Sequence, residues 1–121
     1  MKHSERFVNL VNETKEQIRE ISPEETLARI ESDQAPLLID VREESEWERG
    51  HIVGAIHIGK GVIERDIEKH VEELDREIVL YCGGGYRSAL AAESLQNMEY
   101  QNVASMAGGW RAWNEREYPV K

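Results

Sequence analysis

This chain has very little cysteine and no long apolar run. These two shortages exclude a disulfide-bonded fold and a membrane-spanning helix. Among its 121 residues there is one cysteine, Cys82, so no internal disulfide can form and a reducing compartment is expected. No apolar stretch approaches the roughly 20 residues that a membrane-spanning helix needs. No apolar core follows the first six residues, so no secretory signal is predicted. We therefore expect a cytoplasmic protein that does not act at a membrane.

Positive charge is the second shortage. The chain carries 15 lysine and arginine residues against 24 aspartate and glutamate residues, a formal net charge of −9. An acidic surface repels nucleic acid and anionic lipid, so neither is expected as a partner. A small anionic substrate would need a local positive site, because the overall field opposes its approach.

The pattern of apolar residues predicts one α/β domain. Strands that alternate with helices are typical of a three-layer sandwich, in which helices flank a mainly parallel sheet. The predicted strands are 37–41, 55–58, 78–82 and 103–106, and the predicted helices are 23–32, 43–49, 62–74, 87–98 and one that begins at about Trp110.

The N-terminal segment is predicted to be an amphipathic helical extension of residues 1–16, with the domain proper at 17–121. Phe7, Leu10 and Val11 follow helical spacing and need burial, either on their own domain or on a second subunit. The sequence does not choose between these, so the oligomeric state stays open. The stretch 17–21 fits a short strand as well as the end of a helix.

The segment around Cys82 is the most informative part of the chain. Cys82 ends an apolar strand, three glycines follow it, and a helix is predicted from Arg87 on. Such a loop can turn several N–H groups toward one point, because glycine tolerates positive φ. A nest of this kind, backed by a helix N-terminus, binds anions and stabilises a thiolate. Ligands of parallel sheets bind at this carboxyl edge of the strands.

Three segments of the chain resemble the rhodanese (sulfurtransferase) family. The resemblance extends from about residue 17 to 118, and the three segments have the order and spacing of the family. It implies a parallel five-stranded sheet flanked by helices and persulfide chemistry at Cys82. The three segments are 40–58, which begins Asp-Val-Arg-Glu, 81–88, which reads Tyr-Cys-Gly-Gly-Gly-Tyr-Arg-Ser, and 107–113, which reads Ala-Gly-Gly-Trp-Arg-Ala-Trp.

The chain also departs from the family pattern. Glu99 stands where glycine commonly ends the helix after the loop, and a non-glycine residue at positive φ costs about 1 kcal/mol. Members that use thiosulfate often carry basic residues in the loop, where this chain has glycine. The natural donor is therefore left open between thiosulfate and a persulfide, including a protein persulfide.

The resemblance implies a double displacement with a covalent intermediate, of the thiosulfate:cyanide sulfurtransferase type. The Cys82 thiolate would take the outer sulfur of a small anionic donor, and cyanide or a thiol, including a protein thiol, would collect it from the persulfide. The chemistry needs no cofactor. We also expect no metal, because His51 and His57 have no second cysteine and no carboxylate at ligand spacing. The residues expected to contact the substrate are Gly83, Gly84, Gly85, Tyr86, Arg87 and Ser88.

Several of these residues have alternative roles. Arg87 could orient an anionic donor, or it could pair with a carboxylate such as Asp40 or Glu93. Ser88 could cap the helix, which we favour, or donate a hydrogen bond to a bound anion. Tyr86 is expected to shape the wall of the pocket or to present an apolar rim to partners.

Other candidates have simpler structural roles. Asp40 and Arg42 are expected to support the site by joining neighbouring loops through an ion pair and backbone hydrogen bonds. The tryptophans are interpreted as packing residues: Trp47, Trp110 and Trp113.

Two other functions compete with sulfur transfer. A cysteine phosphatase or arsenate reductase has one residue more between cysteine and arginine than the four here, and a histidine where this chain has Tyr81. The shorter loop makes a tighter ring, which suits a sulfur atom and crowds a tetrahedral oxyanion. A non-catalytic binding module of the same fold is the other alternative, but inactive members typically lose the cysteine that this chain keeps.

Overall fold

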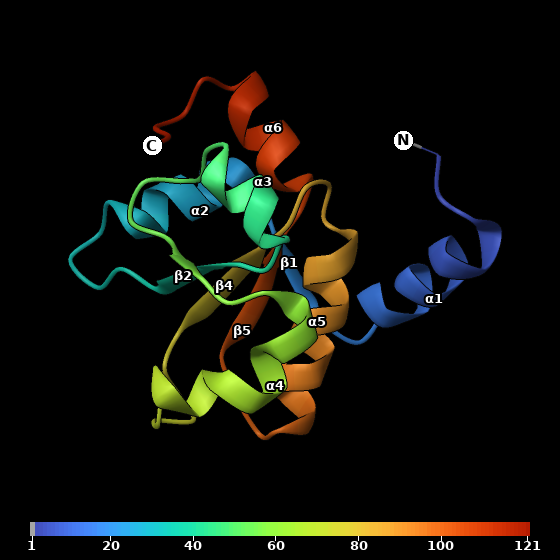
Figure 1. Cartoon of the computed structure of the whole chain (residues 1–121). Coiled ribbons are helices and arrows are strands. Elements are labelled where there is room, and N and C mark those ends of the chain that lie inside the picture. Colours follow the sequence, from blue (N-terminus) through green and yellow to red (C-terminus); the bar gives the residue numbers. More distant parts are fainter. Residues whose placement is uncertain (1) are drawn as a thin grey trace.

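A parallel β-sheet forms the centre of the protein (Figure 1). The computed structural model describes residues 2–121. In this part of the chain the strands are ordered β1-β5-β4-β2-β3, and each neighbouring pair is parallel. Their bounds are β1 (Arg19–Ile21), β2 (Leu37–Asp40), β3 (Ile56–His57), β4 (Ile78–Tyr81) and β5 (Val103–Met106).

Helices cover both faces of the sheet, which confirms the predicted α/β sandwich. Helices α4 and α5 pack on one face and α2 and α6 on the other, while α1 lies along the outer side of α5 (Figure 1). No helix within residues 2–121 has the length and apolar character needed to cross a membrane. The helices are α1 (Glu5–Lys15), α2 (Pro23–Ile30), α3 (Glu44–Glu48), α4 (Ile63–Asp66), α5 (Tyr86–Asn97) and α6 (Gly109–Glu115), with 3₁₀ turns at η1 (Lys60–Val62) and η2 (Ile67–Lys69).

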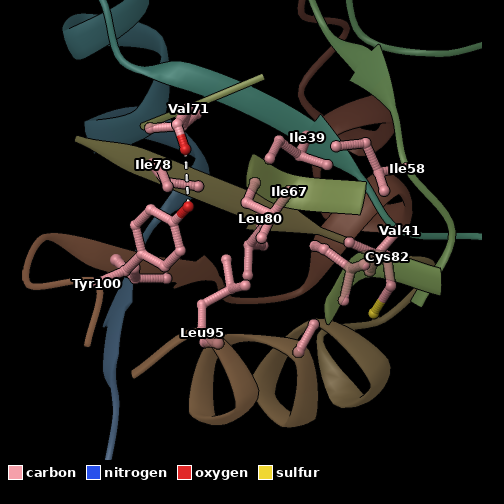
Figure 2. Close-up of a cluster of buried hydrophobic side chains, with 14 residues drawn as sticks. Ile39, Val41, Ile58, Ile67, Val71, Ile78, Leu80, Cys82, Leu95 and Tyr100 are labelled. Carbon is pink, nitrogen blue, oxygen red and sulfur yellow. Dashed lines mark hydrogen bonds between the residues drawn. The ribbon is translucent and has the colours of Figure 1, made fainter. Parts of the chain in front are cut away.

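The central strands are apolar throughout because both of their faces are covered. All four residues of β4 are buried. Ile78 and Leu80 point toward α4 and α5, whereas Val79 and Tyr81 point toward α2 and α6. Figure 2 shows the first of these clusters, in which Cys82 continues the row that Ile78 and Leu80 begin.

The N-terminal helix packs on its own domain. Val11 and Thr14 are buried, and the helix contacts α5. Phe7 is half-buried and Leu10 is 50 % exposed. The chain therefore buries part of this apolar face in cis. The following segment is a strand, β1, which pairs with β5 and settles the alternative that the sequence left open.

The sequence Ser22-Pro23-Glu24-Glu25 predicts a capping box at the start of α2, and the structure shows part of it. The Ser22 hydroxyl accepts a hydrogen bond from the Glu25 N–H at 3.0 Å, and Pro23 occupies the first turn. The Glu25 carboxylate pairs with Arg29 instead of closing a capping box. At the end of α5, Glu99 adopts a φ of 77°, the conformation that its place in the sequence suggested.

The predicted helix over 62–74 is wrong, because the segment folds into η1, α4 and η2 and ends at Lys69. The apolar spacing still predicted which side chains are buried, since Ile63, Ile67 and Val71 all face the core. A tertiary contact competes with the helix: the carbonyl of Val71 accepts a 2.7 Å hydrogen bond from the buried Tyr100 hydroxyl (Figure 2). That bond ties the segment to the end of α5 instead of to its own next turn.

The Tyr100 hydroxyl gives a direct test of this core contact. Tyr100→Phe should lower the free energy of unfolding by about 1–3 kcal/mol, because the Val71 carbonyl would stay buried without its donor. Denaturant titration measures the change. In the matched control, Tyr118→Phe removes a hydroxyl that bonds no group within residues 2–121, and stability should change by less than about 0.5 kcal/mol. Equal losses in both variants would contradict the role given to the contact.

Candidate active site

Cys82 lies at the carboxyl end of β4, where its sulfur is surrounded by hydrogen-bond donors. The residue is 1 % exposed. Its Sγ accepts the Gly85 N–H at 3.1 Å and the Ser88 N–H at 3.3 Å. Gly85 has a φ of 96° and caps the N-terminus of α5, so the loop turns directly into the helix. The two amides converge on the sulfur, as the glycine loop predicted.

The loop is held in this shape by the first turn of α6. The Trp110 N–H donates to the Cys82 carbonyl at 2.7 Å, and the Arg111 N–H donates to the Gly83 carbonyl at 3.1 Å. In a trans peptide the N–H points opposite to the C=O. Pairing these two carbonyls with the N–H groups of α6 therefore turns the N–H groups of Gly83 and Gly84 away from those donors. Both glycines line the pocket.

Gly109 permits this close approach. Its φ is 54°, and a Cβ there would overlap the Cys82 carbonyl oxygen and lie 2.9 Å from the Gly83 carbonyl carbon. Any side chain would push α6 away from the loop. The sequence offered Gly109 as part of a glycine pair before the last helix, but not as a contact to the cysteine loop.

Ser88 does not cap α5, so the preferred sequence interpretation is wrong. Gly85 occupies the N-cap position, because its left-handed backbone starts the helix at Tyr86. Ser88 is buried in the first turn, with its hydroxyl 3.4 Å from the Cys82 sulfur and 2.8 Å from the Ser105 hydroxyl. Ser105 was missed, although a serine within the apolar strand 103–106 was a usable signal.

Arg87 is paired with Glu46, a partner that the sequence did not suggest. The guanidinium makes two hydrogen bonds to the carboxylate, at 2.7 and 3.2 Å, so it pairs with a carboxylate other than Asp40 or Glu93, the two that the sequence offered as examples. The hydrogen bond that Arg87 donates to Glu46 raises the pKa of Arg87, and the same bond lowers the pKa of Glu46. Glu46 also accepts the Glu43 N–H at 3.0 Å, so α3 holds the arginine in place.

Asp40 and Arg42 form a buried ion pair beside the site. Their side chains are 0 % and 4 % exposed, with 2.7 Å between Nη2 and Oδ2. Burial lowers the pKa of Arg42, but the hydrogen bond and charge of Asp40 outweigh it and the pKa is raised. Arg42 also donates to the Gly50 carbonyl at 2.7 Å, and its guanidinium lies 4.6 Å from the centre of the Trp110 ring. The pair thus joins β2, the loop at Gly50 and α6.

A pocket of about 560 Å³ opens over the cysteine loop. Tyr86 lies in its wall, and its ring contacts His3 and Phe7 with centroids 4.7 and 5.9 Å apart. Arg111 lines the pocket from α6. Sequence reasoning missed His3, Phe7 and Arg111 as pocket residues, since no local pattern shows that the N-terminal segment reaches the loop.

The two histidines beside Trp47 make structural contacts. The indole of Trp47 is half-buried and stacks on His51 at 3.5 Å and on His57 at 5.3 Å between ring centres. His57 Nε2 lies 2.7 Å from the Arg42 carbonyl. Within residues 2–121, no three metal-ligating side chains gather in a way that could hold an ion. Of the tryptophans, Trp113 is in the core at 1 % exposed.

Comparison with known proteins agrees with this fold. The family model described as the Rhodanese-like domain matches residues 22–116, which confirms the resemblance drawn from the sequence. The Bacillus subtilis protein named "Putative sulfur carrier protein YrkF" is 35 % identical over 84 % of this chain and 54 % of its own length. This chain thus spans about half of that relative. The "Putative sulfurtransferase YtwF" of the same organism is 36 % identical over 85 % of this chain and 97 % of its own length.

A solved structure shares the whole architecture. It is a Rhodopseudomonas palustris protein of unknown function, described as a possible tyrosine phosphatase. The TM-score is 0.87 at 28 % identity, and the alignment covers 100 % of this chain and 98 % of that one. The similarity therefore includes the N-terminal helix, which lies outside the segment that the family model matches.

Removing Asp40 should strongly destabilise the protein. Asp40→Ala leaves the Arg42 charge buried without its partner, so the free energy of unfolding should fall by about 3–5 kcal/mol. Denaturant titration measures the loss. As a control, Glu24→Ala removes a surface partner of Arg116 and should change stability little, since water screens that pair. A small effect of Asp40→Ala would show that the pair does not hold these elements together.

Gly109→Ala should separate α6 from the cysteine loop. The added methyl overlaps the Cys82 carbonyl, so stability should fall by about 1–3 kcal/mol, measured by denaturant titration. Gly61→Ala is the matched control: no atom lies within 4 Å of its Cβ position, and its φ is not in the left-handed region. The control should change stability by less than about 1 kcal/mol. A Gly109 variant as stable as the control would contradict the tight contact.

Proposed function

The chain belongs to the rhodanese-like domain family, and from this premise we propose that it is a sulfurtransferase that carries sulfane sulfur on Cys82 as a persulfide. Relatives named as sulfurtransferases support sulfur transfer in general. The observation that carries the finer proposal is the pair of N–H groups, from Gly85 and Ser88, that meet at the cysteine sulfur on the floor of a pocket.

The first half-reaction loads the cysteine. The Cys82 thiolate attacks the outer sulfur of the donor, so that a new S–S bond forms to Sγ and the S–S bond of the donor breaks. The leaving group departs with the electron pair, as sulfite when the donor is thiosulfate. The Ser88 hydroxyl lies where it can donate to Sγ, and donors to a charged acceptor form strong hydrogen bonds.

The second half-reaction transfers the sulfane sulfur from Cys82 to the acceptor. The terminal sulfur of the persulfide carries negative charge, which the N–H groups of Gly83 and Gly84 stabilise as an oxyanion hole stabilises an oxygen. Cyanide attacks that sulfur and leaves as thiocyanate, and the Cys82 thiolate is regenerated. A thiolate acceptor, on a small molecule or a protein, becomes a persulfide by the same displacement. Neither half-reaction needs a general base once the thiol is ionised.

Phosphate transfer is the second candidate, favoured by the description of the R. palustris structure as a possible tyrosine phosphatase. In this chain four residues separate Cys82 from Arg87, and the arginine is engaged by Glu46. A phosphoryl group would therefore meet a short loop whose cation is already paired. We propose that phosphatase activity is absent.

Sulfur loading tests the proposal directly. The intact mass of the wild type should rise by one sulfur atom after brief incubation with thiosulfate, and cyanide should remove that sulfur as thiocyanate. Cys82→Ser should gain nothing, because its hydroxyl cannot form the persulfide. Mass spectrometry and a colorimetric thiocyanate assay measure the two steps.

Other outcomes separate the alternatives. Loading only by organic or protein persulfides would keep the mechanism and exclude thiosulfate as a donor. A folded wild type that no donor loads would refute sulfur transfer and favour the binding module. Hydrolysis of an aryl phosphate that disappears in Cys82→Ser would establish the phosphatase instead.

A further inference from the structure

We infer that the N-terminal segment makes this pocket selective for organic sulfur donors, with Phe7 contacting the carbon-bearing group and Arg111 the anionic group. The inference rests on the proposed sulfurtransferase function and names the substrate class of the same site. These donors are organic thiosulfonates and organic persulfides, which carry both an anionic group and a carbon group beside the sulfane sulfur. Inorganic thiosulfate has the anionic group but no carbon.

One wall of the pocket is aromatic, and two of its three rings come from outside the family segment. His3, Phe7 and Tyr86 contact one another, with ring centroids 4.7–5.9 Å apart. Lys15 lies 5.2 Å from the centre of the Tyr86 ring and helps to hold it against α1. The family model begins at residue 22, so a domain with only the matched segment would lack two of these three rings.

Phe7 remains only half-buried although α1 packs on α5. Its ring lines the pocket that also contains Cys82. An aromatic ring presented to a cavity favours an apolar or aromatic group, because burying both surfaces removes them from water. Thiosulfate has no carbon and cannot use this wall.

Arg111, another lining residue, supplies the available positive charge. Arg111 is exposed and makes no salt bridge with any residue in the range 2–121, whereas Arg87 is paired with Glu46. An Arg111 Nη2 lies 3.8 Å from the Cβ position of Gly84, so the guanidinium reaches over the cysteine loop. In a chain of net charge −9, an unpaired guanidinium in the pocket is the group that can draw in an anion.

The size of the pocket fits an organic ligand. About 560 Å³ lies within the range of roughly 300–1,000 Å³ that is typical of sites for organic molecules. The cation on α6 and the aromatic wall on α1 and α5 therefore form a site for a molecule with an anionic group and a carbon group, whose sulfane sulfur is directed at Cys82.

An aryl thiosulfonate meets these requirements and reacts in a balanced step. The Cys82 thiolate attacks the outer sulfur of benzenethiosulfonate, the Sγ–S bond forms and the sulfur–sulfur bond of the donor breaks. Benzenesulfinate leaves with the electron pair and one negative charge, and the persulfide keeps the other. No oxidant or reductant is needed.

The test compares benzenethiosulfonate with thiosulfate as donor, with cyanide as acceptor, in wild type and variants. Phe7→Ala should lower kcat/KM for benzenethiosulfonate about tenfold, because the ring contact is lost, and should change thiosulfate turnover less than about twofold. Phe7→Leu keeps an apolar side chain at this position of α1 and should give an intermediate loss. Leu10→Ala is the matched control on the same helix, since Leu10 is 50 % exposed and outside the pocket lining.

Arg111→Gln should raise KM for both donors about tenfold and leave kcat nearly unchanged, as expected for loss of anion binding. Arg76→Gln is its control: it removes the same charge from the chain at a site away from this pocket. Retained thermal unfolding temperatures would show that the variants remain folded.

Two results would overturn the inference. If Phe7→Ala and Phe7→Leu lower turnover of both donors equally, or of neither, the aromatic wall does not select the donor. If Arg111→Gln behaves like Arg76→Gln, the guanidinium does not bind the anion. Failure of the proposed function is distinguishable, because a folded wild type would then accept sulfur from neither donor.

Discussion

The hydrogen bonds between the first turn of α6 and the loop after β4 are the contact on which the rest of the site depends. They fix the direction of two peptide planes, and peptide geometry then turns the N–H groups of Gly83 and Gly84 away from the donors of α6. Gly109 permits the approach, because only a residue without a Cβ fits against the Cys82 carbonyl. The last helix of the chain thus determines the surroundings of the sulfur.

The arginines near the site differ in whether a carboxylate neutralises their charge. Arg42 is buried with Asp40 and joins β2 to α6, while Arg87 is tied to α3 through Glu46. Both charges are already balanced in the folded chain. Arg111 is exposed in the same pocket and has no such partner within residues 2–121. In an acidic protein this asymmetry matters, because a paired cation attracts a substrate anion far less than an unpaired one.

The N-terminal helix gives the pocket a wall that the family domain alone would not have. Val11 is buried where α1 packs on α5, and this places Phe7 and His3 beside the Tyr86 ring at the mouth of the site. The full-length structural similarity to the R. palustris protein includes the backbone of this helix. The extension therefore belongs to the site as well as to the fold.

The sequence by itself determined the alternation of strands and helices, the parallel sheet and the position of Cys82 at its carboxyl edge, because these follow from local apolar patterns and glycine. It failed for 62–74, where the bond from Tyr100 overrides helical spacing, and for Ser88, whose position depends on the turn at Gly85. The partner of Arg87, the approach of α6 and the aromatic wall were decided only by the tertiary structure. Each joins segments distant in the chain, and no local pattern encodes which distant side chains will meet.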